Sequence, residues 1–161
     1  MWGAISAKAF QAMTYHKTKK LTAQEWVRAM RGGRVSAAIQ NLKTSRSGPY
    51  RIICDNEGLL TAKDTRPLYR RHNIQLVPIP PRSPDLNPIE RFWGWLRRQL
   101  RLRDLRDHRD GKPALGKMAY RARVKAFLKT RKAQNAAKRQ WNSMRSVARI
   151  IIKKKGAASG R

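Results

Sequence analysis

The chain has few acidic residues and almost no cysteine. Only 9 of its 161 residues are Asp or Glu, against 38 Lys and Arg, which gives a formal net charge of +29 at pH 7. With the single Cys54, no internal disulfide can form and a cysteine-based zinc finger is excluded. No apolar run approaches the roughly 18 residues of a membrane-spanning helix, and no secretory signal is visible. We expect an intracellular protein without a membrane span, nuclear in a eukaryote and nucleoid-associated otherwise.

The excess of positive charge indicates a polyanionic partner. Self-repulsion among the cations opposes compaction, and a polyanion relieves it while releasing its own counterions. From Lys112 to Arg161 the chain has many Lys and Arg residues but no Asp or Glu. DNA or RNA is therefore the first partner to expect, although an anionic membrane surface would give the same attraction.

Apolar periodicity and turn residues predict an alternation of strands and helices in the first half of the chain. We expect a strand and its exit over 2–10, one or two helices over 21–42 interrupted at Gly32-Gly33, strands over 50–54 and 74–79, and a helix over 62–72. Thr22 and Glu25 have the spacing of a capping box, so a helix should begin between them.

A further helix should begin at Pro88, with Asn87 as its cap. Its apolar stripe consists of Ile89, Phe92, Trp93, Leu96 and Leu100. Trp93 should be buried with this stripe. Trp95 lies on another face, so it should be more exposed or contact another element.

Beyond this helix the composition changes. Residues 101–110 alternate in charge, which is typical of a solvated helix face or of a linker, and Gly111-Lys112-Pro113 ends the segment. A helix over 115–131 should pack through Leu115, Met118, Ala119, Ala122 and Ala126, and a later helix passes through Trp141, Met144, Val147, Ala148 and Ile151. Residues 153–161 form a basic tail.

Two carboxylates stand out by their positions. Asp55 directly follows the apolar run 50–54, and Glu90 lies at the start of the helix from Pro88, with 34 residues between the two. Judged alone, Glu90 is an ordinary acidic residue of a helix first turn. However, Asp55-Asn56, Thr61-Ala62-Lys63 and Ser83-Pro84-Asp85-Leu86-Asn87-Pro88-Ile89-Glu90 occur in an order that resembles the catalytic core of the mariner-type DDE transposases.

This resemblance implies an RNase H-like α/β fold, here incomplete, followed by a basic α-helical extension. It also implies that Asp55 and Glu90 are catalytic residues that bind Mg²⁺ or Mn²⁺, because hard oxygen ligands suit these ions. Such a site uses three carboxylates, yet Glu25 is the only acid before Asp55. We expect the first catalytic Asp to precede Met1, and a protein partner or a second copy of the chain to complete the fold.

We expect four segments: a partial RNase H-like domain over 1–104 whose last helix covers 88–104, a linker over 105–114, a basic helical extension over 115–152 and a flexible tail over 153–161. Candidate nucleic-acid-binding residues are Lys63, Arg91, Arg97, Arg98, Arg121, Arg123, Lys125, Lys129, Arg131, Lys132, Lys138, Arg139, Lys153, Lys154 and Lys155.

Three hypotheses of function remain open at this point. The chain can be a DNA-binding member of the transposase family. Its intact relatives cleave and transfer DNA strands, whereas this chain is itself inactive. It can instead be a non-catalytic, transposase-derived nucleic-acid-binding protein, for example a structural component of an RNA- or DNA-containing assembly. It can also be a decayed fragment without a selected role.

Overall fold

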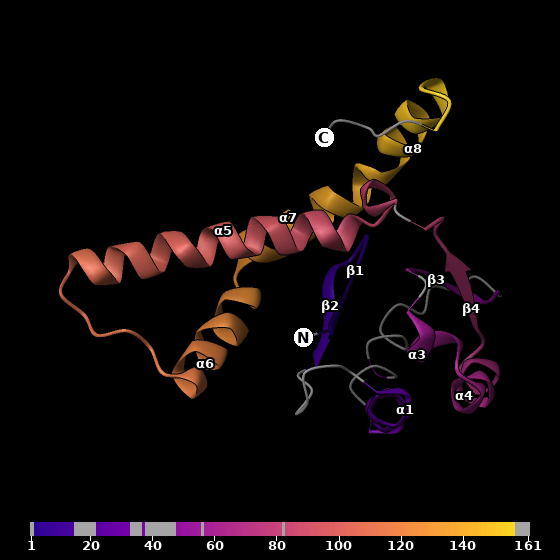
Figure 1. The fold of residues 1–161 in the computed structure, drawn as a ribbon, viewed down its shortest axis with the longest axis horizontal. Coiled ribbons are helices and arrows are strands. Elements are labelled where there is room, and N and C mark those ends of the chain that lie inside the picture. Colours follow the sequence, from indigo (N-terminus) through magenta and orange to yellow (C-terminus); the bar gives the residue numbers. More distant parts are fainter. Residues whose placement is uncertain are drawn as a thin grey trace. The chain divides into compact units, whose positions relative to one another are not determined.

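The computed structural model describes residues 2–14, 22–32, 37, 48–55, 57–81 and 83–156. The chain divides into two compact units, one formed by residues 1–4 and 11–87 and the other by residues 5–10 and 88–161. We call these unit 1 and unit 2. Figure 1 shows their elements, which combine helices with two small sheets.

Unit 1 contains a parallel pair of strands joined by short helices. Strand β3 (Tyr50–Cys54) pairs with β4 (Ile74–Pro78), with Tyr50 opposite Ile74 and Cys54 opposite Pro78. Parallel neighbours require a crossover connection, which here consists of α3 (Gly58–Thr61), the 3₁₀ turn η1 (Lys63–Thr65) and α4 (Arg66–Arg71). Both predicted strands and the predicted helix ending before Asn73 are confirmed, whereas α3 lacks a sequence pattern that would have predicted it.

The core of unit 1 lies where helix α1 (Ala23–Arg31) meets this crossover. Its buried residues are Trp26, Met30, Cys54, Leu60, Leu68 and Tyr69. The indole Nε1 of Trp26 donates a hydrogen bond of 2.9 Å to the Tyr69 hydroxyl, so both aromatic side chains are buried with their polar atoms satisfied. The predicted capping box at Thr22 and Glu25 is present. The second helix expected within 21–42 lies largely outside the described residues.

The N-terminal segment forms a hairpin instead of the single strand expected over 2–10. Strand β1 (Trp2–Ser6) pairs with β2 (Ala9–Thr14) across a turn at Ala7-Lys8. The Ser6 hydroxyl accepts a hydrogen bond of 3.0 Å from the Lys8 amide, and Ala9 has φ 92°. Sequence reasoning missed this turn because it contains no Gly, Pro, Asn or Asp, and Ser6 is a weaker turn signal than these residues.

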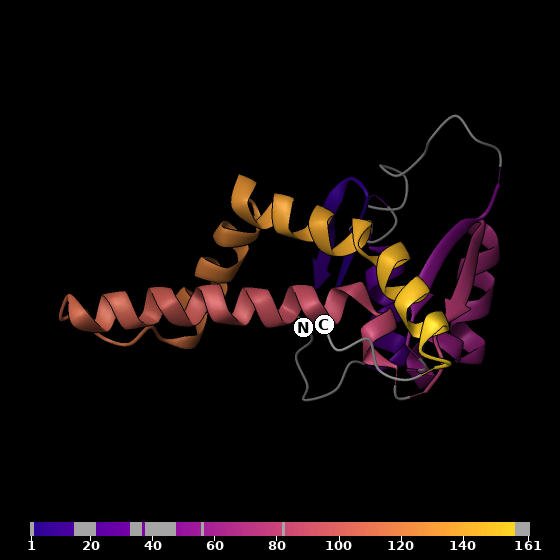
Figure 2. The same ribbon diagram turned by 90° about the horizontal axis from the view of Figure 1, so that it is seen from above.

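Unit 2 is built on helix α5 (Pro88–Arg109), followed by α6 (Lys117–Leu128), α7 (Arg131–Asn142) and α8 (Met144–Lys153). Helices α5 and α7 lie side by side in both ribbon views (Figures 1 and 2). Phe92, Leu96 and Leu100 form the buried stripe of α5, and α7 buries Ala133, Ala136 and Ala137. These small alanine side chains let the two helix backbones approach closely.

The aromatic residues of α5 pack differently from the sequence prediction. Phe92 is fully buried, whereas Trp93 and Trp95 are both half-buried. Trp93 meets Phe10 edge to face with 6.0 Å between ring centroids, so it lies at the margin of the stripe and not within it. Trp95 stacks between Phe92 and Phe127 of α6. This confirms the prediction that Trp95 is either more exposed or in contact with another element.

Helix α5 continues through residues 105–109, which were expected to begin a linker. Its end is a Schellman motif: the Gly111 amide donates to His108 O and the Lys112 amide to Asp107 O, with Gly111 at φ 68°. The alternating charges therefore belong to a helix face and not to a linker, which were the two interpretations that the sequence left open. Arg123 of α6 binds Asp104 and Asp107 on this face.

The buried face of α6 also differs from the expected one. Val124, Phe127 and Leu128 are buried, whereas the expected packing residues Leu115, Met118, Ala119, Ala122 and Ala126 are all exposed. Burying large side chains removes more apolar surface from water than burying alanines. The Phe127 ring also stacks on the Trp95 ring. The helix predicted over 115–131 ends earlier, at Leu128. Thr130 instead caps the next helix, α7, by accepting a hydrogen bond from the Ala133 amide.

Candidate functional site

Asp55 lies at the carboxyl end of the parallel strand β3. Its side chain is half-buried and follows the buried Cys54. Burial raises the pKa of the Cys54 thiol, and the negative charge of Asp55 adds to the increase. The carboxyl ends of parallel strands are the usual location of ligand sites in α/β folds, so Asp55 has the local position expected of a metal ligand. Asn56, which follows it, lies outside the described residues.

Glu90 lies in the first turn of α5 and is exposed. The 3₁₀ turn η2 (Pro84–Leu86) and the buried residues Asn87 and Pro88 precede it, which orders the chain where the helix begins. The partial positive charge at a helix N-terminus favours a carboxylate there. Both Glu90 and Asp55 are therefore carboxylates next to the ends of regular elements, as the sequence predicted.

Glu25 is used for another purpose. Its carboxylate accepts a hydrogen bond of 3.1 Å from the Thr22 amide, and the Thr22 hydroxyl accepts one of 3.2 Å from the Glu25 amide. This acid stabilises the first turn of α1. Among residues 1–54 it is the only acid, so these residues offer no further carboxylate as a metal ligand.

The two candidate ligands belong to different units, Asp55 to unit 1 and Glu90 to unit 2. Over the described ranges, no three or more His, Cys, Asp or Glu side chains form a group that could hold a metal ion. The donor set that these residues offer is two carboxylates. Such oxygen ligands fit Mg²⁺ or Mn²⁺, which need further ligands to complete their coordination.

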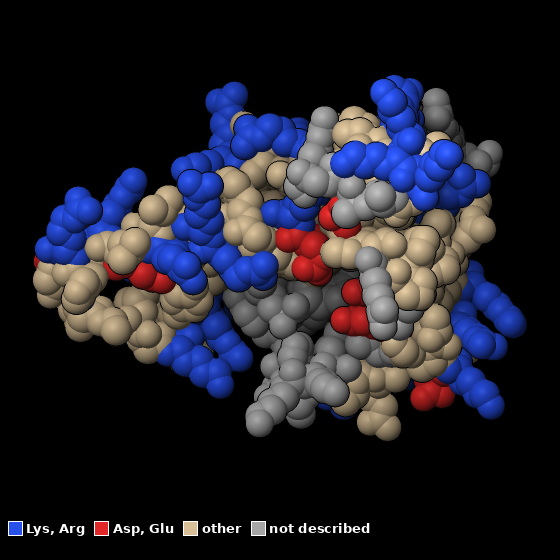
Figure 3. Space-filling view, turned by 45° about the horizontal axis from the view of Figure 1, so that its top comes forward, with Lys and Arg blue, Asp and Glu red and all other residues tan. Residues whose placement is uncertain are grey.

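Most of the basic residues predicted to bind nucleic acid are exposed. This holds for Lys63, Arg97, Arg98, Lys125, Lys129, Arg131, Lys132, Lys138, Arg139, Lys153, Lys154 and Lys155, while Arg91, Arg121 and Arg123 are half-buried. Figure 3 shows Lys and Arg side chains spread over one face of the chain, with far fewer Asp and Glu. The guanidinium of Arg123 is paired with Asp104 and Asp107, and its binding of phosphate stays a prediction.

Helix α7 carries a basic stripe. Arg131, Lys132, Lys138 and Arg139 are all exposed and recur at a spacing of seven residues, on the side opposite the buried alanines. Sequence reasoning missed Lys117, Arg145 and Arg149, which are also exposed. Their helical spacing from other basic residues was the available signal. Among the described helices, none has the length and apolarity required to cross a membrane.

Comparisons with known proteins agree on one family. The family model of the DDE superfamily endonucleases matches residues 1–111. Over 47 residues, the chain is 40% identical to the transposable element Tcb2 transposase of Caenorhabditis briggsae and 43% identical to the transposable element Tc3 transposase of Caenorhabditis elegans. Each match covers 29% of this chain, but only 17% and 14% of the two relatives. No solved structure matches the chain.

Proposed function

Because this chain belongs to the DDE superfamily endonucleases, we propose that it is part of a transposase that cleaves and transfers DNA strands with divalent metal ions. Asp55 and Glu90 are the two carboxylates that this chain contributes to metal binding. The observation that carries the proposal is the local setting of these acids, one at the end of a parallel strand and the other in the first turn of α5. Strand β3, the crossover, β4 and α5 then form part of an RNase H-like core.

The chemistry follows from the charge of the ligands and the substrate. Bound Mg²⁺ or Mn²⁺ lowers the pKa of a coordinated water or hydroxyl and neutralises charge on the phosphate under attack. Asp55 and Glu90 would hold the ions through carboxylate oxygens. The exposed Lys and Arg side chains would bind DNA phosphates away from the reaction and thereby position the strand without reading its sequence.

Two carboxylates are fewer than a two-metal site uses. Since Glu25 is occupied in a capping box, the third acid in this proposal comes from polypeptide outside these 161 residues. A site without it should bind at least one ion weakly and align the attacking oxygen poorly. These residues alone should therefore neither cleave nor join DNA.

Paramagnetic broadening by Mn²⁺ tests the ligand assignment even when binding is weak. As Mn²⁺ is added to the ¹⁵N-labelled chain, the amide signals next to Asp55 and those next to Glu90 should broaden together. Asp55→Asn should reduce the broadening at both places. Asp64→Asn removes an exposed carboxylate of the same unit outside the motif, so it is the matched control and should change neither.

Independent broadening at the two positions, or equal effects of Asp55→Asn and Asp64→Asn, would contradict a shared metal site. A nicking assay on supercoiled plasmid with Mn²⁺ tests activity, and we expect no nicked product. Nicking that Asp55→Asn and Glu90→Gln both abolish would support the family chemistry, but would show that the third acid is not required from outside.

A further inference from the structure

A hollow of about 570 Å³ lies where α7 meets α8 in unit 2. It is lined by Ala7, Trp141, Asn142, Met144, Arg145 and Ala148. Apart from Ala7, these residues lie beyond the stretch that matches the DDE family model. The hollow involves neither Asp55 nor Glu90, so whatever binds here is independent of the proposed metal ligands.

The two helices that line this hollow meet at Ser143. Helix α7 ends at Asn142 and α8 begins at Met144, while the Ser143 hydroxyl donates a hydrogen bond of 2.9 Å to Gln140 O. The Val147 amide donates to Ser143 O at 3.1 Å, and the Val147 side chain is buried. The helical path thus continues almost uninterrupted through Ser143.

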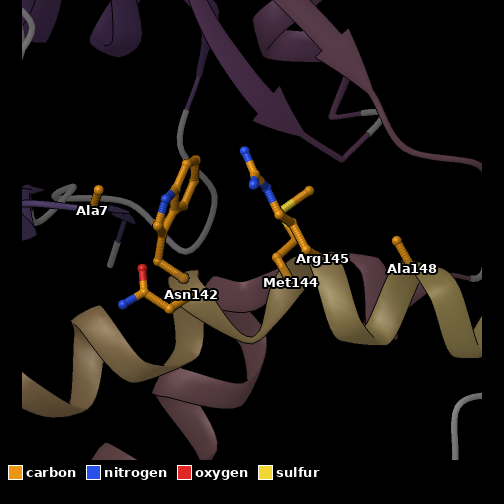
Figure 4. Close-up of a pocket in the computed structure, with 6 residues that line it drawn as sticks. Ala7, Asn142, Met144, Arg145 and Ala148 are labelled. Carbon is orange, nitrogen blue, oxygen red and sulfur yellow. The ribbon is translucent and has the colours of Figure 1, made fainter.

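Trp141 and Arg145 are four residues apart along this path, so they lie on the same side of it. The Arg145 side chain extends away from α8 on the same side as Met144 (Figure 4). Trp141 is half-buried, which leaves part of its indole accessible, and Arg145 is exposed. An aromatic surface and a guanidinium thus line one hollow, with the Asn142 amide at its edge.

We propose that this hollow binds an unpaired nucleotide of single-stranded nucleic acid. A base stacks on the Trp141 indole next to the apolar side chains of Met144 and Ala148, and Arg145 binds the adjoining phosphate. Aromatic stacking beside a cationic group is the usual basis of sequence-tolerant single-strand binding. In a duplex the bases are stacked on each other, so a nucleotide must leave the stack before it can enter.

The surrounding charge favours this occupant over a peptide. Residues 112–161 contain 16 Lys and Arg and no Asp or Glu. A basic partner would be repelled, and an apolar peptide would cover Arg145 without pairing its charge. A nucleotide supplies both a flat ring for the indole and a negative charge for the guanidinium.

Fluorescence anisotropy with two oligonucleotides separates stacking from phosphate binding. The full chain is titrated into a labelled oligothymidylate and into an abasic strand of the same length, which has the same phosphates but no bases. We expect tighter binding of the oligothymidylate. Trp141→Leu should weaken that binding by about 5-fold to 100-fold and leave binding of the abasic strand unchanged, while Trp141→Phe should retain most of the preference.

Arg149 provides a matched control for Arg145, because it is exposed on the same helix but does not line the hollow. Arg145→Gln should weaken binding of both strands more than Arg149→Gln does. The comparison of the two strands on the unaltered chain requires no variant, so it remains decisive if Trp141→Leu fails to fold.

Equal affinities for the two strands, or equal effects of Arg145→Gln and Arg149→Gln, would overturn the proposal. If the chain bound both strands tightly and with equal affinity, binding of phosphates by its basic surface would still be supported. Failure at the hollow is therefore distinguishable from failure of the proposed function.

Discussion

Arg123 extends from α6 to two aspartates of α5, and its guanidinium joins the helices by ion pairs to Asp104 and Asp107. The Arg123 Nη1 lies 2.6 Å from an Asp104 carboxylate oxygen. Lys112, just beyond the end of α5, contacts Asp107 at 3.3 Å and Asp110 at 3.1 Å. Asp107 therefore accepts from two cations, Lys112 in the connection between α5 and α6 and Arg123 within α6.

This arrangement predicts a pH-dependent stability. Hydrogen bonding from Arg123 is the largest cause that lowers the pKa of Asp107 in the folded chain, and Lys112 lowers it further. A carboxyl group with a lowered folded pKa stabilises the fold fully above its unfolded pKa, about 3.9, and this stabilisation is lost as the pH falls through the folded pKa. Urea unfolding should show Asp107→Asn less stable than the unaltered chain at neutral pH, with a difference that shrinks below about pH 4.

Asp64→Asn is the control for this measurement, because Asp64 is exposed and outside these ion pairs. This variant removes one negative charge without changing a partner of Arg123 or Lys112, and at neutral pH it should destabilise the chain less than Asp107→Asn does. If the deficit of Asp107→Asn were the same at neutral and acidic pH, Arg123 would not be stabilising the charged carboxylate.

Among the helices, α5 links the sequence motif to the helical extension. Its first turn holds Glu90, its middle buries Phe92, Leu96 and Leu100 against other elements of unit 2, and its last turns carry the aspartates bound by Arg123. Because the aromatic rings of Trp95 and Phe127 stack at 5.8 Å between centroids, α6 is held to α5 by apolar as well as ionic contacts. Arg103 adds a cation–π contact at 4.6 Å from the Phe127 ring.

Two glycines of this helical segment should respond oppositely to the same substitution. Gly111 has φ 68°, a conformation that costs other residues roughly 1–2 kcal/mol, so Gly111→Ala should destabilise unit 2 by about that amount. Gly94 lies inside α5 with open space around its Cα, and Ala is favoured over Gly there by roughly 0.5–1 kcal/mol. Gly94→Ala should therefore stabilise the chain in denaturant unfolding. Destabilisation by Gly94→Ala would contradict an open helix interior at this position, and an unchanged stability of Gly111→Ala would contradict the described helix end.

At the scale of the whole molecule, the positive net charge determines how binding of a polyanion depends on salt. A net charge of +29 on 161 residues makes any nucleic-acid affinity depend steeply on salt, because each neutralised phosphate releases counterions. Deleting residues 112–161 would not isolate this effect. The deletion removes α7, which packs against α5, and α6, whose Phe127 ring stacks on Trp95, so it would disturb the fold together with the charge.

Exchanging surface charges avoids this problem. Replacing the α7 stripe Arg131, Lys132, Lys138 and Arg139 by Gln should flatten the log–log dependence of duplex DNA affinity on salt, by about 0.9 for each phosphate that the variant no longer neutralises. The control replaces the same number of exposed arginines in unit 1, namely Arg51, Arg66, Arg70 and Arg71. If both quartets flattened the slope equally, affinity would depend on net charge and not on the α7 stripe.

Much of this protein follows from its sequence because the responsible interactions are local. The Val- and Ile-containing strands β3 and β4, the capped start of α1 and the Gly111 end of α5 depend on residues within a few positions of each other. For the same reason the positions of Asp55 and Glu90 next to element ends were predictable. The excess of exposed Lys and Arg also follows directly from composition.

Only tertiary structure decided which of several possible faces is buried. Phe127 of α6 is buried because Trp95 and Arg103 of α5 surround it, although the alanine face of the same helix was an equally regular pattern. Arg123 is paired within unit 2 because two aspartates of another helix reach it. The hollow at Trp141 and Arg145 likewise exists because α7 and α8 meet at Ser143. Such contacts join residues far apart in the chain, and burial against a partner element is what selects among faces that local periodicity leaves equivalent.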